Sequence, residues 1–318
     1  MELFALARNP VPSGAVVGEF KGHDGAVMRY ARFQATRGPR QGTVCIFTGR
    51  AEFIEKYFEV IADLRRRGFA AAIMDWRGQG RSDRALADRD KGYVDDFATY
   101  DRDLATFMRE IVLPDCPPPY IALGHSMGGN IMLRNAGAPG SWFSRMVLCS
   151  PMIELHPSQL GAPVWAARSY AELGCLQGLR TRYVHGAHDW RENKMPFEDN
   201  FLTSDRERYM RNKGLAEAAP ELTIGGQTIG WLRAALRSMA LVGDPAFARR
   251  VGLPILFFIA GKDRIVSQAA IEDFSARVKS GTHVILSDSR HEILQETDDV
   301  RGRFWAAFDA YLDIGQKV

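Results

Sequence analysis

The chain has 318 residues, of which 46% are hydrophobic and 25% are charged, a composition typical of a globular protein with a full hydrophobic core. Lys and Arg number 41 against 38 Asp and Glu, so the formal net charge is only +3. Because the basic residues are also scattered, apart from Arg65–Arg67, this balance argues against a nucleic-acid-binding surface, and no nucleic-acid partner is expected.

The cysteines and the apolar runs indicate the cellular compartment of the protein. Cys45, Cys116, Cys149 and Cys175 include no C-x-x-C pair and no metal-like spacing, so we expect four core residues in a reducing compartment. The N-terminal stretch lacks the pattern of a signal peptide, and the apolar run at 253–261 is too short to span a bilayer. The expected location is the cytoplasm, and this prediction allows peripheral contact with the inner face of the membrane.

The first half of the chain alternates between strand-like and helix-like segments. Residues 18–34 carry a Gly/Asp turn between extended runs, which predicts an antiparallel hairpin at a sheet edge. Further strands are predicted at 43–49, 69–75, 120–124 and 145–150, and helices at 52–68, 95–111 and 127–136. Strands that are apolar throughout and alternate with helices are typical of a parallel sheet covered on both faces.

The alternation stops after Ser150 and resumes near residue 253, with strands predicted at 253–261 and 283–287 and helices at 268–278 and 298–312. The stretch between has no strand-like run, and Ser204 with Glu207 has the pattern of a capping box, which predicts a helix there. We interpret residues 1–150 and 248–318 as one α/β core. Residues 151–247 would then be a helical insertion at the C-terminal edge of the sheet, where open α/β folds bind ligands.

Residues 124–128, Gly-His-Ser-Met-Gly, follow a predicted strand and open a predicted helix. G-x-S-x-G in that context is the pattern of a nucleophile elbow, a strained turn that lifts the serine hydroxyl above the sheet. A serine hydroxyl is a weak nucleophile and needs a base and an acid that orients the base. Asp263 and His291 each follow a later predicted strand, in the order serine, acid, histidine. The pattern therefore predicts a catalytic triad of Ser126, Asp263 and His291.

Three other residues are weaker candidates for the same roles. His283 opens its predicted strand at the wrong end. His125 is the chain neighbour of the nucleophile and cannot easily turn back to take its proton, so packing or support of nearby residues is expected of it. Asp288 lies three residues before His291 in the same loop, which makes it a weaker acid candidate than Asp263.

Two further motifs are incomplete. Residues 291–296 begin like the zinc motif H-E-x-x-H, but Gln295 stands where the second histidine should be. Residues 77–82 resemble a fragment of a dinucleotide-binding loop, but Ser82 replaces the third glycine, and a tight turn after the strand ending at Asp75 is the better account. Neither a metal nor a cofactor is expected.

Acyl transfer also needs hydrogen-bond donors for the oxyanion of the tetrahedral intermediate. One expected donor is the backbone N–H of Met127, the residue after the nucleophile. The other is expected in the turn Thr48-Gly49-Arg50, where the backbone N–H of Arg50 would donate and Gly49 would let the chain approach closely. A plain turn is the alternative interpretation of these three residues.

With these residues the sequence resembles the α/β-hydrolase superfamily, and within it the monoacylglycerol lipase and lysophospholipase branch, also grouped as serine aminopeptidase-like hydrolases. Many members of this branch carry His-Gly in the oxyanion turn, where this chain has Thr48-Gly49. The Gly-Arg pair at 49–50 is similar to the bacterial lysophospholipase subgroup. The segments that carry the resemblance are GRAEFIEKYFEVIADLRRRGFAAAIMDWRGQGRSDR (49–84), GHSMGG (124–129), SPM (150–152), LTSDRERY (202–209), GKDRIV (261–266) and HEILQE (291–296).

The resemblance implies an α/β-hydrolase fold, a mostly parallel sheet flanked by helices with a helical cap insertion. It implies that Ser126 attacks an ester carbonyl, that His291 takes and returns the proton, and that Asp263 holds the imidazolium before water releases the acid. The expected partner is a small-molecule acyl ester of a single-chain lipid, either a lysophospholipid or a monoacylglycerol. A shallow apolar cap face would allow peripheral membrane contact, and the oligomeric state is not predicted.

Other functions stay open from the residues alone. A proline iminopeptidase-like aminopeptidase would need acidic cap residues that hold a free amino terminus, and a short-chain carboxylesterase or a non-catalytic ligand-binding protein would use the same fold. Dehalogenases and epoxide hydrolases are disfavoured because they carry Asp where Ser126 stands. The cap mixes acidic and basic side chains, which fits a phosphate-bearing head group at least as well: Glu172, Asp189, Glu192, Glu198 and Asp199 with Arg180, Arg182, Arg191 and Lys194.

Overall fold

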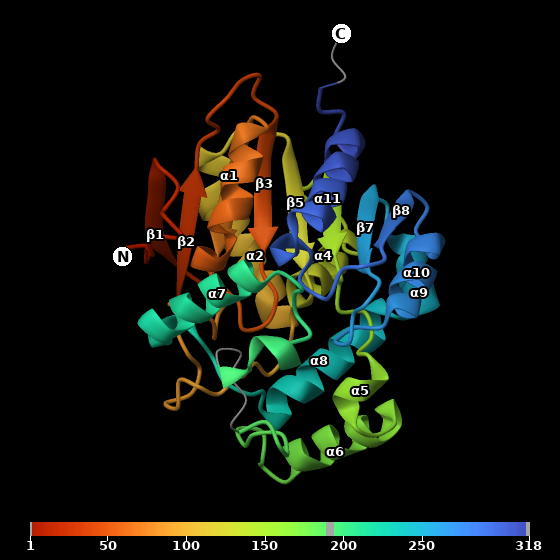
Figure 1. The fold of residues 1–318 in the computed structure, drawn as a ribbon. Helices are drawn as coiled ribbons and strands as arrows, with labels where there is room; N and C mark the ends of the chain where they lie inside the picture. Colours follow the sequence, from red (N-terminus) through yellow and green to blue (C-terminus); the bar gives the residue numbers. More distant parts are fainter. Residues whose placement is uncertain (1, 189–193, 316–318) are drawn as a thin grey trace.

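The computed structural model describes residues 2–188 and 194–315, and its centre is one eight-stranded sheet with the order β1-β2-β4-β3-β5-β6-β7-β8 (Figure 1). β1 and β2 form the predicted edge hairpin, and β2 also runs antiparallel to β4, whereas all other neighbours are parallel. The strands are β1 Ala15–Lys21, β2 Val27–Phe33, β3 Gly42–Phe47, β4 Phe69–Met74, β5 Tyr120–His125, β6 Arg145–Cys149, β7 Ile255–Ala260 and β8 Gly281–Leu286. The predicted mostly parallel α/β sheet is confirmed.

Helices cover both faces of this sheet, which is why its central strands are apolar throughout. β7 shows the division. Ile255, Phe257 and Ile259 pack into one core with α2, α4, α10 and the later helix α8 (Ile229–Val242), and the residues between them pack into the other core with α1 and α11. The helices of the core are α1 Phe58–Arg66, α2 Ala98–Phe107, α3 Leu113–Asp115, α4 Met127–Ala136, α10 Gln268–Arg277 and α11 Asp298–Tyr311. Three cysteines lie in the core as expected, and Cys175 is only half-buried.

Two predicted helices differ in detail from the structure. The helix expected at 52–68 begins as a 3-10 turn, Ile54–Tyr57, because the Ile54 N–H donates to Asp75 and the Glu55 carboxylate binds Arg29. The helix expected at 95–111 begins at Ala98 and widens into a π turn, Met108–Val112, before α3. In both cases the chain stays helical but changes its winding within the predicted segment.

The described residues between β6 and β7 add no strand to the sheet. Their α-helices are α5 Pro157–Leu160, α6 Val164–Leu176, α7 Arg206–Ala218, α8 Ile229–Val242 and α9 Pro245–Arg250, and short 3-10 helices lie at Phe197–Asp199 and Pro220–Leu222. Figure 1 shows α5, α6 and α8 gathered beyond the end of the sheet toward which β3 points. α9 runs across the expected boundary at residue 247. Within residues 2–188 and 194–315, no helix has the length and apolarity needed to cross a bilayer.

The predicted capping box at Ser204 and Glu207 is wrong. α7 begins one residue later, and its N-cap is Asp205, whose carboxylate accepts the Arg208 N–H at 2.8 Å. The Ser204 hydroxyl instead donates to the Glu296 carboxylate of the core. Aspartate caps a helix as well as serine does, so a tertiary partner for Ser204 was enough to move the helix start.

Candidate functional site

Ser126, the candidate nucleophile, stands at the turn between β5 and α4 with φ +50° and ψ −112°. A residue with a side chain rarely adopts this conformation, so the surroundings must hold it there. The Ser126 N–H donates to the Cys149 carbonyl at 3.1 Å, and the Ser126 carbonyl accepts the Met152 N–H at 2.9 Å. The end of β6 therefore holds the strained turn on both sides.

The elbow lies against the turn that follows β3. A Cβ placed on Gly128 would be 2.2 Å from the Phe47 carbonyl oxygen, so only glycine allows α4 to begin so close to β3. A Cβ on Gly49 would be 3.3 Å from the Cβ of Ser126. The Gly49–Arg50 turn and the start of α4 therefore both pack closely against the Ser126 turn.

Asp263 and His291, the candidate acid and base, are directly bonded and almost fully buried, with exposed fractions of 3% each. The His291 Nδ1 lies 2.7 Å from Asp263 Oδ2, while Asp263 Oδ1 accepts the backbone N–H groups of Ile265 at 2.7 Å and Val266 at 3.1 Å. Burial acts to raise the pKa of Asp263, but the His291 charge and these hydrogen bonds outweigh it and lower the pKa. The carboxylate is thus ionised and fixed in orientation.

The candidate base, His291, contacts the residue that precedes the nucleophile. The rings of His125 and His291 are 4.8 Å apart between centroids, and His125 directly precedes Ser126. Among the described residues, no hydrogen bond joins the Ser126 hydroxyl to His291, and hydrogen bonds of this kind often become short and well aligned only when a substrate binds. The three candidate side chains come from the loops after β5, β7 and β8.

The three weaker candidates for the acid and base roles have other partners in the structure. His283 turns away, and its Nδ1 lies 2.8 Å from the Ser275 hydroxyl oxygen. Asp288 is 62% exposed and 3.3 Å from Arg303, not beside His291. His125 supports its neighbours, as expected, because its Nδ1 lies 3.0 Å from the Glu52 carboxylate.

The side chain of Arg50 extends from the candidate oxyanion turn to the inserted helices. Its guanidinium donates to the Gly225 carbonyl and lies 5.4 Å from the centre of the Trp231 ring, at the start of α8. Burial lowers the pKa of Arg50 to about 10, so the group is still cationic at neutral pH. The Arg50 side chain therefore places a positive charge between the core and the cap.

Sequence reasoning did not single out Glu52. Its carboxylate lies just behind the turn at 48–50 and is 3% exposed, bonded to Tyr57 and His125. The residue stands at the start of a segment with helical periodicity, and nothing in that periodicity distinguishes a buried carboxylate from a solvated one. Only the partners that the fold brings to it mark it as part of the site.

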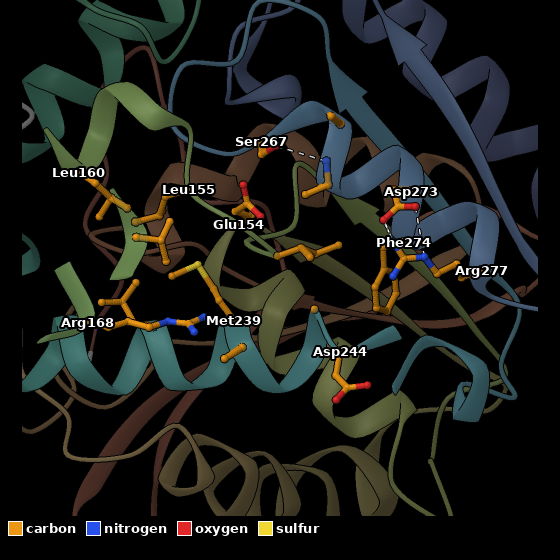
Figure 2. A pocket seen from close by; sticks show the side chains of 17 residues that line it. Glu154, Leu155, Leu160, Arg168, Met239, Asp244, Ser267, Asp273, Phe274 and Arg277 are labelled. Atoms are coloured by element: carbon orange, nitrogen blue, oxygen red, sulfur yellow. Dashed lines mark hydrogen bonds and ion pairs between the residues drawn. The ribbon is translucent and has the colours of Figure 1, made fainter. Parts of the chain in front are cut away.

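A pocket of about 590 Å³ opens between the cap helices and α10 (Figure 2). Leu160, Arg168 and Met239 line it from the cap helices, and Ser267, the N-cap of α10, and Phe274 line it from the core. None of the three candidate catalytic residues lines it. Nowhere in the described parts of the chain do three or more His, Cys, Asp or Glu side chains gather in a way that could hold a metal ion.

Comparisons with known proteins identify the family and the fold of the chain. The family described as serine aminopeptidase, S33, matches residues 38–298. Lysophospholipase L2 of Escherichia coli K12 is 33% identical over 297 residues, covering 89% of this chain and 83% of that protein. A soluble variant of monoglyceride lipase from Saccharomyces cerevisiae, solved with a substrate analogue, has a TM-score of 0.73 at 19% identity and covers 95% of this chain and 97% of that one. A carboxyl esterase from Bacillus coagulans, solved with glycerol, has the same TM-score at 18% identity, with 95% and 99% covered.

Proposed function

Because the chain belongs to the serine aminopeptidase S33 family of α/β-hydrolases, among lysophospholipase-like and monoacylglycerol lipase-like enzymes, we propose that it hydrolyses the carboxylic ester of a single-chain lipid at Ser126. The observation that carries this proposal is the strained Ser126 turn beside the bonded pair of Asp263 and His291. Holding an ionised carboxylate on the histidine while a serine is kept in a rare backbone conformation serves nucleophilic catalysis.

The proposed reaction is acyl transfer in two steps. His291 takes the proton of the Ser126 hydroxyl as the oxygen attacks the ester carbonyl, and the backbone N–H groups of Arg50 and Met127 donate to the oxyanion. The intermediate collapses when His291 returns the proton to the leaving alcohol, which leaves an acyl-enzyme. Water then attacks the acyl carbonyl with the same base, and the fatty acid departs while Ser126 regains its proton. Asp263 stabilises the imidazolium in both steps.

We favour a lysophospholipid over a monoacylglycerol as the substrate. The relative with 33% identity over most of both chains is a lysophospholipase. Arg50 supports the same choice, because the residue whose backbone N–H would bind the ester oxygen also carries a guanidinium at the boundary between core and cap. Guanidinium and phosphate make strong charge-assisted hydrogen bonds, whereas a glycerol hydroxyl gains less from the same group.

The aminopeptidase alternative loses support from the cap. Glu172, the candidate on α6 for binding an amino terminus, already binds Arg233 and Arg237 at 2.7 Å each. The Glu198 carboxylate likewise accepts a hydrogen bond from Arg206 at 2.9 Å. Three further charged candidates, Asp189, Arg191 and Glu192, lie outside the described residues.

We further propose that the cap, residues 151–247, rests on the lipid surface from which the substrate is taken. Trp165, Leu173 and Leu176 project from α6 with exposed fractions of 72%, 57% and 82%. Their spacing puts them on one side of the helix, which they share with the polar Ser169 and Glu172, and there they expose apolar surface that the described chain does not cover. An apolar helix face with a tryptophan suits the boundary between head groups and acyl chains. The cytoplasmic location stays a prediction.

The test of the proposed function is fatty-acid release from lysophosphatidylcholine and from a monoacylglycerol, measured side by side with Ser126→Ala. We expect faster release from lysophosphatidylcholine and no release by the variant. Equal and negligible release by wild type and variant would reject the lipid esterase, and an aminoacyl amide and a short-chain ester in the same series would then identify the other two enzyme classes.

A further inference from the structure

Glu52 connects the parts of the site that have to meet at the reacting ester. One oxygen of its buried carboxylate, Oε2, accepts hydrogen bonds from the Gly49 N–H and from the Tyr57 hydroxyl at 2.7 Å, and it lies 3.0 Å from His125 Nδ1. Gly49 directly precedes Arg50, and His125 directly precedes Ser126. A single oxygen atom is therefore bonded to the chain neighbour of the candidate nucleophile and to the chain neighbour of a candidate oxyanion donor.

The contacts of His125 extend this connection to the candidate base. Its Nε2 lies 3.3 Å from the carbonyl oxygen of His291. A carboxylate and a carbonyl both accept hydrogen bonds, so His125 donates from both ring nitrogens only as an imidazolium. Burial acts to lower the pKa of His125, but the Glu52 charge and hydrogen bond outweigh it and raise the pKa. Below this raised pKa, His125 and Glu52 form a buried ion pair next to the nucleophile.

Opposite charges surround the ion pair. Lys56 Nζ lies 3.4 Å from Glu52 Oε1 and 2.6 Å from Glu292 Oε1, and Glu292 is the residue after His291. Glu52, Lys56, His125 and Glu292 are each at most 5% exposed. Two carboxylates and two cations in contact offset the desolvation that each charge would suffer alone. Close packing also leaves little freedom, since a Cβ on Gly49 would lie 2.8 Å from Glu52 Oε2 and 2.9 Å from His125 Nδ1.

We propose that Glu52 is a positioning residue, whose carboxylate holds the oxyanion turn through Gly49 and the nucleophile turn through His125 in one fixed arrangement. The inference rests on the proposed serine hydrolase function and extends it to a residue that touches no substrate. A fixed distance between donor and nucleophile matters for the transition state and much less for binding of the ground state.

The test uses the full chain with Glu52→Gln, which keeps the size of the side chain and removes its charge. On lysophosphatidylcholine we expect kcat to fall by about 100-fold while KM changes by no more than about twofold. The rate at which a fluorophosphonate labels Ser126 should fall in parallel, because that reaction needs the same oxyanion donors but no lipid.

The matched control is Glu55→Gln, the same change three residues further along the chain. Glu55 is also fully buried, but its carboxylate binds Arg29 at 2.7 Å and does not contact the turn at 48–50 or His125. This control variant should have a lower melting temperature and a labelling rate within about twofold of wild type. Glu52→Gln losing no more labelling rate than Glu55→Gln, or raising KM at constant kcat, would overturn the proposal.

Two possible results need a further measurement: a Glu52→Gln variant that does not fold, and a wild type that is inactive on both lipids. If Glu52→Gln does not fold, Glu52→Asp is measured in the same way, because it keeps the charge and draws the oxygen away from Gly49. If wild type releases no fatty acid from either lipid, the proposed substrate is wrong, and the labelling rates of the two glutamate variants still decide the role of Glu52.

Discussion

Replacing Asp263 by asparagine changes one atom of the pair with His291 and reverses the direction of its hydrogen bond. Asp263 Oδ1 is held by the N–H groups of Ile265 and Val266, so the amide oxygen of the substituted side chain would keep these two donors. Its NH₂ group would then face His291 Nδ1, now 2.7 Å from Oδ2. Since an amide nitrogen can only donate, His291 would have to carry its proton on Nε2, the atom that must accept the Ser126 proton.

The expected loss is about 10⁴-fold in kcat, equivalent to about 5 kcal/mol of transition-state stabilisation, with little change in melting temperature or KM. The assay is fatty-acid release from lysophosphatidylcholine at neutral pH. Asp288→Asn is the matched control, because Asp288 is an exposed carboxylate before the same histidine and binds Arg303 instead. A loss below about tenfold for Asp263→Asn, or an equal loss in the control, would refute the assignment of Asp263 as the orienting acid.

Three further changes test the head-group preference, the pH dependence of stability and the binding of the cap to a lipid surface. Arg50→Gln keeps the backbone donor, so we expect its release rate to fall about tenfold more on lysophosphatidylcholine than on a monoacylglycerol. Burial acts to raise the pKa of Glu59, but Arg208 and two other arginines outweigh it and lower the pKa to about 2. The stabilisation that ionised Glu59 gives the folded state is therefore complete above the ordinary pKa of 4.5 and is lost as the pH falls toward 2. Glu59→Gln should flatten the fall in melting temperature between these two pH values. The double variant Trp165→Ser, Leu176→Ser should bind phosphatidylcholine vesicles about tenfold more weakly and hydrolyse monomeric substrate at the wild-type rate.

Much of the core could be predicted because its signals are local. The bounds of α4, residues 127–136, match the prediction, since the elbow defines the helix start and the apolar period defines its length. The hairpin of β1 and β2 follows from the turn between them, and the parallel strands follow from runs that are apolar on both faces. Asp263 and His291 were found by their places after strands, because parallel strands bring the loops at their C-terminal ends to one edge of the sheet.

Only the tertiary structure decided which side chains bond across that edge. By its own pattern, the sequence determined the type of fold, the place of the candidate nucleophile and the order of its partners, because periodicity and turn residues act over a few neighbours. It could not show that Ser204 would leave its helix for Glu296, or that Glu52 would share one oxygen with residues 49 and 125. A buried charge is stable only with partners from distant segments, and those partners become neighbours only when the chain has folded.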